Sequence, residues 1–256
     1  MRDWAEHPHY GWVIVISMLL IQTISSGLGF YNMSVYMSFF ARELDASLDA
    51  VSLSVSLFFI SGGVAGLFVA RLLERWDVRM IMVIGALVSG VALLLIGRAS
   101  NLYELYVLFT LFGIGNTGVS IVVATSLITQ WFPDERRSVA LSISSTGLSL
   151  GGVLITPYTA YLFDKSGIFS VMPLLGVIFV VGIVPIVMLF VRPSVTSQKV
   201  KELKQDFEIE YLQVVKSRFF ICVTAAYVLI MAAQVGGIAH LYNRANALGG
   251  LDVATG

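Results

Sequence analysis

Long apolar stretches alternate with short polar connectors along most of this chain. A helix needs about 20 residues to cross a hydrocarbon layer roughly 30 Å thick, and each stretch is long enough to do so. Six stretches precede one long charged segment, and a seventh follows it. They cover residues 11–39, 50–72, 80–97, 105–130, 138–162, 170–191 and 219–241. The pattern therefore predicts an all-α membrane protein with seven transmembrane helices.

The charged segment 192–218 differs from everything around it. Its apolar residues recur at steps of three and four, at Val200, Leu203, Phe207, Tyr211 and Val214. This spacing is typical of an amphipathic helix on a membrane interface, with a solvated linker helix as the alternative. We therefore expect three parts: a six-helix bundle (1–191), a cytoplasmic loop with an amphipathic helix (192–218) and a seventh helix with the residues after it (219–256).

The composition supports a membrane protein and excludes several function classes. Hydrophobic residues make up 57% of the chain and charged residues 12%, and the mean hydropathy is +0.86. The net charge of zero gives a nucleic-acid partner no electrostatic support. The chain has one cysteine, Cys222, so no disulfide can form within it. We find no paired intramembrane carboxylates, zinc motif or phosphate-binding glycine loop, and we expect neither an enzyme nor a cofactor.

The basic residues predict the orientation in the membrane. If the helices alternate in direction, twelve of the 16 Lys and Arg residues fall on the side of the N-terminus and the long loop. The other side holds Arg42, Arg98, Lys165 and Arg244. Cytoplasmic loops are rich in Lys and Arg. We therefore expect a multi-pass protein of the plasma (inner) membrane with its N-terminus and residues 192–218 in the cytoplasm.

Uncharged polar residues form stripes on the predicted helices. On the first helix, one face holds Gln22, Ser25, Ser26, Gly29, Asn32 and Tyr36. The small-xxx-small pairs Gly62–Gly66 and Gly147–Gly151 indicate close helix packing. A carboxamide is costly to leave unpaired in hydrocarbon. Two interpretations stay open for the four carboxamides, an interhelical bond or a water-filled substrate path. They are Gln22, Asn32, Asn116 and Gln234.

Two connectors resemble a known transporter family. The run GGVAGLFVARLLERWDVRMIM is similar to the signature of the major facilitator superfamily, with Glu74 at its acidic position and Arg75 and Arg79 at its basic positions. Ala70 and Asp77 replace the two glycines of that signature. The run QWFPDERRSVALSISSTGLSLGGVLITP resembles the corresponding segment of the monocarboxylate-porter branch.

This resemblance implies a fold of twelve helices in two halves, with substrate bound between the halves. The chain would supply the first half, built as two three-helix inverted repeats, plus the loop and helix seven. It would therefore be a truncated sequence whose partner is the missing C-terminal half. The implied function is secondary transport of a small organic solute, with a monocarboxylate as the expected substrate and protons as a candidate coupling ion. The alternatives are a drug or metabolite exporter and a non-transporting membrane sensor or scaffold.

The candidate site residues fall into two groups. The first and fourth helices are expected to line the pathway, and the expected substrate-binding residues are Gln22, Tyr31, Asn32, Asn116, Thr117, Ser120 and Gln234. A charged cluster on the two connectors is expected to act as a gate, and its members are Glu74, Arg75, Asp77, Arg79, Asp134 and Arg136.

Overall fold

The computed structural model describes residues 10–132, 134–192 and 217–247. Its contacts divide the chain into two units, Met1–Ser194 and Val195–Gly256, and we describe each by itself. The predicted amphipathic helix of the loop lies outside the described residues. Among the described residues, seven helical segments are long and apolar enough to cross a membrane, which confirms the predicted all-α membrane fold. They are Tyr10–Tyr31, Leu48–Arg75, Val78–Ile96, Leu102–Trp131, Glu135–Ser166, Ile168–Phe190 and Arg218–Gly237.

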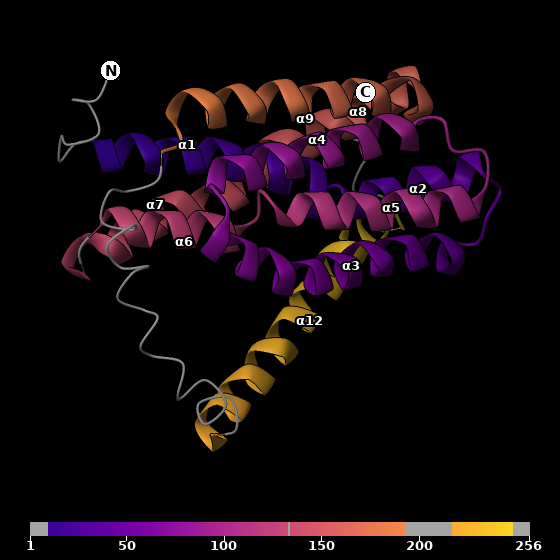
Figure 1. Ribbon diagram of the computed structural model, residues 1–256. Coiled ribbons are helices and arrows are strands. Elements are labelled where there is room, and N and C mark those ends of the chain that lie inside the picture. The colour runs from indigo at the N-terminus through magenta and orange to yellow at the C-terminus, as the bar shows by residue number, and fades with distance from the viewer. Residues whose placement is uncertain (1–9, 133, 193–216, 248–256) are drawn as a thin grey trace. The chain divides into compact units, whose positions relative to one another are not determined.

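Three of the six segments in the first unit are single helices and three are interrupted (Figure 1). The single helices are α3 (Leu48–Arg75), α4 (Val78–Ile96) and α9 (Ile168–Phe190). The first segment consists of α1 (Tyr10–Ser25), the π-helical turn η2 (Ser26–Tyr31) and α2 (Met33–Glu43). The fourth consists of α5 (Leu102–Thr117) and α6 (Ile121–Trp131). The fifth consists of α7 (Asp134–Leu150), the π-helical turn η3 (Gly151–Ile155) and α8 (Thr156–Ser166).

Short connectors with capping residues separate these segments. The side chains of Ser47, Asp77 and Asn101 each accept a hydrogen bond from a backbone N–H in the first turn of the helix that follows. Such caps satisfy backbone donors that a helix start leaves unpaired. Gly167, with φ of +77°, forms the turn into α9, a conformation that favours glycine. Because the connectors are so short, consecutive segments run in opposite directions.

The helix pairs of the first unit repeat a pattern. The second segment packs on the fourth (α3 on α5) as the fifth packs on the first (α7 on α1). The third segment packs on the fourth (α4 on α5) as the sixth packs on the first (α9 on α1). The remaining large contact joins α4 to α9, which lie side by side in Figure 1. Exchanging the first three segments with the last three leaves this set of pairs unchanged. The bundle is therefore built as two three-helix inverted repeats, as predicted.

Glycines and aromatic rings fill the core of this bundle. A Cβ atom built on Gly90 would lie 2.9 Å from the carbonyl oxygen of Gly176, and one built on Gly176 would lie 2.5 Å from the oxygen of Gly90. Real Cβ atoms do not come so close, so the backbones of α4 and α9 are in direct contact. At one end of the bundle, the fully buried rings of Tyr36 and Phe163 pack with centroids 5.9 Å apart.

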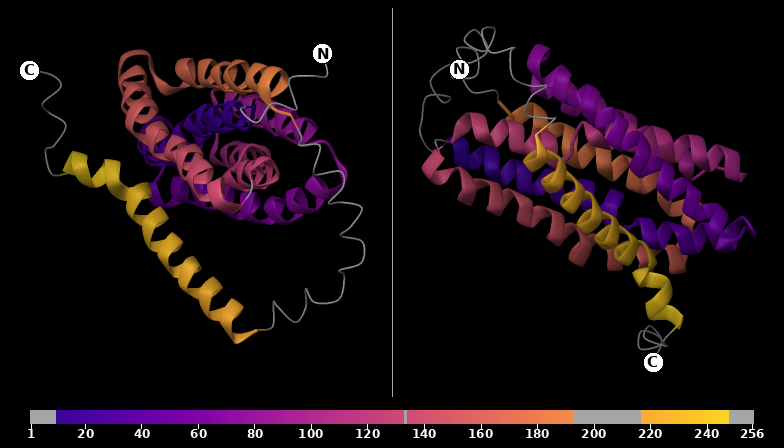
Figure 2. Two further views of the ribbon diagram at one scale, coloured as in Figure 1. Left: turned by 90° about the vertical axis from the view of Figure 1, so that its left-hand side faces the viewer. Right: turned by 90° about the horizontal axis from the view of Figure 1, so that it is seen from below.

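The second unit contains one described helix, α12 (Arg218–Ala247), which is 30 residues long. It includes the seventh predicted span, and Figure 2 shows it in two further views. Its length exceeds the roughly 20 residues that a bilayer crossing requires.

Candidate functional site

Three helices of the bundle depart from regular α-helical geometry. The first and fifth segments contain the π-helical turns η2 and η3, and the fourth is interrupted at Gly118–Ser120. At that interruption the N–H of Gly118 bonds to the oxygen of Gly115 at 3.0 Å, which is a tighter turn than that of an α-helix. The first and fourth segments are counterparts in the two repeats. Both counterparts are therefore broken, and breaks of this kind are frequent at functional sites.

Glycine contacts bring the first and fifth segments together at their π-helical turns. A Cβ on Gly27 would lie 2.9 Å from the carbonyl oxygen of Gly151, and a Cβ on Gly147 would overlap the carbonyl group of Leu19. The hydroxyl of Ser26 donates to the carbonyl of Leu148 at 2.9 Å. Gly147 and Gly151 thus pack against the first segment, as predicted.

Asn116 lies where the fourth segment meets the first. Its Oδ1 accepts a hydrogen bond from the hydroxyl of Ser25 at 2.8 Å. Its amide group lies over Gly29, where a Cβ atom would come within 3.2 Å of Nδ2. Ser25 is buried, whereas Asn116 is only half-buried. Asn116 thus stays partly exposed.

Tyr31 occupies a similar position between the first and fifth segments. Its half-buried ring lies against Gly152, where a Cβ atom would come within 2.9 Å of two ring carbons. The ring also packs edge to face on Phe30, with centroids 5.1 Å apart. A larger residue in place of Gly152 would displace the ring of Tyr31.

Asn32 and Thr117 each make hydrogen bonds to other residues of the bundle. Asn32 is fully buried, and its Nδ2 donates to the hydroxyl oxygen of Thr159 at 3.1 Å and to that of Tyr36 at 3.4 Å. The hydroxyl of Thr117 lies within hydrogen-bonding distance of the carbonyl oxygens of Gly62 and Gly113. Both side chains therefore join neighbouring helices.

The three remaining candidates differ in their surroundings. Gln22 is 2% exposed, and its Nε2 has no hydrogen-bond partner among the described residues. The buried hydroxyl oxygen of Ser120 also has none in the described part of the chain. Gln234 is an exposed residue of α12 in the second unit.

The candidate substrate residues lie in an uncharged environment. No charged residue occurs within 10–41, 105–132 or 138–163, which are the inner parts of the interrupted helices. Among the described residues, no group of three or more His, Cys, Asp and Glu side chains could hold a metal ion. The arrangement can therefore bind a solute through hydrogen bonds and aromatic contact.

The predicted gate residues lie at helix ends. Asp77 caps α4 by accepting from the N–H of Arg79 at 2.9 Å, and the other residues of this connector, Glu74 and Arg75, are exposed. Arg136 is exposed near the start of α7, the helix that begins at Asp134. Within the described residues, no ion pair joins Arg75 to the α7 end. The gate is still a prediction.

An aromatic cluster that the sequence did not predict joins three helix ends. The indole N–H of Trp131 donates to the carbonyl of Arg192 at 2.9 Å, and the hydroxyl of Tyr10 donates to the carbonyl of Phe190 at 2.9 Å. The rings of Tyr10 and Trp131 lie 5.4 Å apart, and the guanidinium of Arg192 lies 5.9 Å from the ring of Tyr10. The Trp-Phe-Pro run was the only available signal, because the contacts are distant in sequence.

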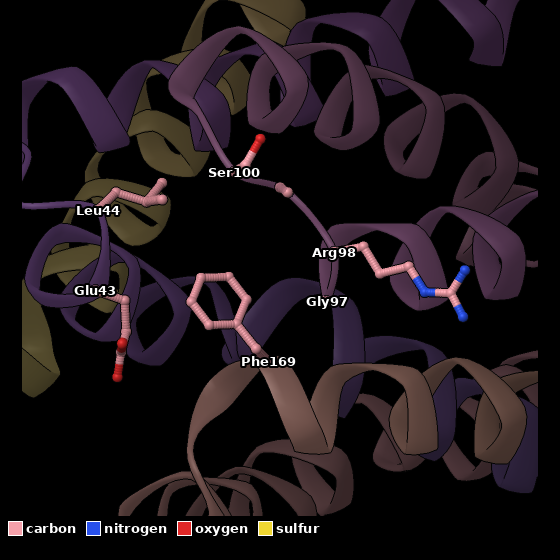
Figure 3. A pocket seen from close by; sticks show the side chains of 7 residues that line it. Glu43, Leu44, Gly97, Arg98, Ser100 and Phe169 are labelled. Carbon is pink, nitrogen blue, oxygen red and sulfur yellow. The ribbon is translucent and has the colours of Figure 1, made fainter.

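A shallow hollow of about 390 Å³ lies at the opposite end of the bundle. It is lined by Glu43, Leu44, Gly97, Arg98, Ala99, Ser100 and Phe169. Figure 3 shows the ring of Phe169 directed into it, whereas the charged ends of Glu43 and Arg98 point away from it and from each other. These two charges therefore do not converge on a common ligand.

Comparison with known proteins gives a consistent family. The model of the Major Facilitator Superfamily matches residues 19–250. The MFS-type transporter pynF of Aspergillus niger is 29% identical over 206 residues, which are 77% of this chain and 45% of the relative. Monocarboxylate transporter 14 of Homo sapiens is 25% identical over 63% of this chain and 32% of its own. Multidrug resistance protein MdtG of Proteus mirabilis is 26% identical over 86% of this chain and 55% of its own. The chain thus spans between about a third and just over half the length of these relatives.

Proposed function

The chain belongs to the major facilitator superfamily, and from this membership we propose that it takes part in secondary transport of a small organic solute by alternating access. One observation carries the proposal. Ser25 and Asn116 meet across the first and fourth segments, which are counterparts in the two repeats and are both interrupted. Helices broken near the middle of the membrane are where transporters of this type bind their substrates.

We propose a monocarboxylate as the substrate. Two observations support this choice: the resemblance of the run from Gln130 to Pro157 to the monocarboxylate-porter branch, and the similarity to a relative named as a monocarboxylate transporter. The carboxylate itself would need a cationic partner or a proton. The first six membrane segments supply no charged side chain away from their ends. The charge would therefore be balanced elsewhere, and the bundle would bind the polar oxygen atoms and the carbon skeleton.

Uptake of labelled L-lactate and pyruvate by cells that express the protein tests this proposal. We expect saturable uptake that Asn116→Leu abolishes or weakens through a higher KM, because this substitution removes a half-buried carboxamide beside the break. Ser17→Ala is the matched control, since Ser17 is a buried residue of α1 whose hydroxyl bonds to its own helix at Val13. No uptake of either acid above that of control cells would contradict the proposal.

Asn32→Leu separates substrate binding from helix packing. The side chain of Asn32 bonds to Thr159 and Tyr36, and an interhelical bond of this kind contributes about 0.6 kcal/mol in membranes. A lowered melting temperature with unchanged uptake kinetics would assign Asn32 to packing. A raised KM at an unchanged melting temperature would assign it to the pathway.

Export of drugs is the second candidate function. The match to the relative named as a multidrug resistance protein covers 86% of this chain, and an uncharged site with an accessible aromatic ring suits a lipophilic solute. Ethidium accumulation in cells with and without the protein tests it. Lower accumulation in expressing cells, together with no uptake of lactate or pyruvate, would favour the exporter.

A further inference from the structure

The bond between Ser25 and Asn116 determines which atoms Asn116 can offer to a solute. A carboxamide has an oxygen that accepts hydrogen bonds and a nitrogen that donates two. The hydroxyl of Ser25 donates to Oδ1 at 2.8 Å. Ser25 is only 3% exposed, so water does not compete effectively for this hydroxyl. The oxygen of Asn116 is thus engaged by the protein.

Gly29 fixes the position of the same amide group. Ser25 is the last residue of α1, Gly29 lies four residues later within η2, and both contact the side chain of Asn116. A Cβ at position 29 would lie 3.2 Å from Nδ2 and 3.6 Å from Oδ1, so an amide in this place requires glycine or a small shift. Nδ2 makes no hydrogen bond to any of the residues that the structure describes, and Asn116 is half-buried. The N–H donors are therefore the part of this side chain that no described residue engages.

We propose that Ser25 is a positioning residue that holds Asn116 with its N–H donors toward the solute. This half of the site then binds an acceptor oxygen of the substrate, either a carboxylate or a carbonyl oxygen. The inference rests on the proposed transport function and deepens it. Without the hydroxyl of Ser25 the amide can turn over and present its oxygen instead, which repels an acceptor.

Uptake kinetics of labelled pyruvate test the inference, because pyruvate carries only acceptor oxygens. Ser25→Ala should raise KM by about two- to tenfold, the range that corresponds to one ordinary hydrogen bond, with Vmax changed less than twofold. Ser25→Thr retains the hydroxyl and should restore most of the affinity. Ser17→Ala, again the matched control, removes a hydroxyl of similar burial (4% exposed) from the same helix and should leave KM unchanged.

A double-mutant cycle shows whether Ser25 acts through Asn116. Ser25→Ala should add nothing in the Asn116→Ala background, because the group that it orients is absent. If the two changes instead multiply their effects on KM, Ser25 has an independent role and the inference is wrong. A wild-type KM in Ser25→Ala would also overturn it.

Asn116→Asp covers the case in which Ser25→Ala does not fold. This variant keeps an acceptor for Ser25 and the shape of the side chain but removes both N–H donors, so KM for pyruvate should rise at least as much. Wild-type kinetics in Asn116→Asp would overturn the inference. Absence of uptake by the wild type itself would overturn the proposed function, and the inference with it. The wild-type measurement therefore distinguishes failure of the proposed function from failure of the inference alone, in which the wild type takes up pyruvate and the variants share its KM.

Discussion

Replacing Gly147 by alanine should force the first and fifth membrane segments apart. The added Cβ would overlap the carbonyl group of Leu19 and would lie 3.1 Å from the Cβ of Gln22. A backbone carbonyl cannot turn aside as the end of a flexible side chain can. The two helices must therefore separate along the line of contact between α1 and α7.

The structure sets the expected size of this effect. Separating packed atoms by about 0.5–1 Å forfeits a quarter to a half of their dispersion attraction. Overpacked cores lose typically 1–3 kcal/mol, and we expect about 2 kcal/mol here because both π-helical turns continue the same interface. For a chain of this size, that loss corresponds to a fall of roughly 4–8 °C in melting temperature.

The assay is thermal unfolding of the detergent-solubilised protein, followed by loss of the monodisperse species. Gly63→Ala is the matched control, because a Cβ at Gly63 would meet nothing within 4 Å. Both variants gain the same helix propensity, up to about 1 kcal/mol, so their difference isolates the steric term. Equal melting temperatures for the two variants would refute the close backbone contact of α1 and α7.

Three further predictions concern topology, gating and the cluster at the helix ends. In a cysteine-free background, an impermeant thiol reagent applied to intact cells should label a cysteine at Ser47 and not one at Ser197, and the reverse result would invert the predicted orientation. Arg75→Ala should slow uptake while expression stays near normal, and normal uptake would exclude a gating role. Trp131→Phe removes one half-buried N–H donor and should cost about 1 kcal/mol, seen as a melting temperature lower by roughly 2–4 °C. The same change at the exposed Trp76 should have no such effect.

The seven helices could be predicted because hydropathy over 20 residues records whether a segment can cross a membrane. Hydropathy predicted the residues at which the helices begin and end less well. The predicted second span, 50–72, is the longer helix Leu48–Arg75 in the structure. The prediction ended it too early because the last turn carries Glu74 and Arg75, so its sequence is no longer apolar. The glycine contacts could also be foreseen from their spacing at Gly147 and Gly151, because close backbone packing needs small residues four apart.

The arrangement of the candidate site could not be predicted, because η2 changes the helix phase. In a regular helix, Ser25, Gly29 and Asn32 would share one face. A residue added within one turn rotates everything beyond it by about 100°. Ser25 and Gly29 therefore contact Asn116 of the fourth segment, whereas Asn32 bonds to Thr159 of the fifth. No residue type in the run Ser26–Tyr31 marks a π-helical turn on its own.

The reciprocal contact of Gly90 and Gly176 bears on the origin of the bundle. In a symmetric dimer, the same surface of each subunit meets its own copy across the axis. The helices α4 and α9 meet in this manner, each glycine against the carbonyl of the other, which is the arrangement that fusion of two copies of a three-helix unit produces. Once fused, the two copies can change separately. A contact between two different residues occurs twice in a symmetric dimer, whereas a fused chain can make it once, as a single bond between Ser25 in one copy and Asn116 in the other.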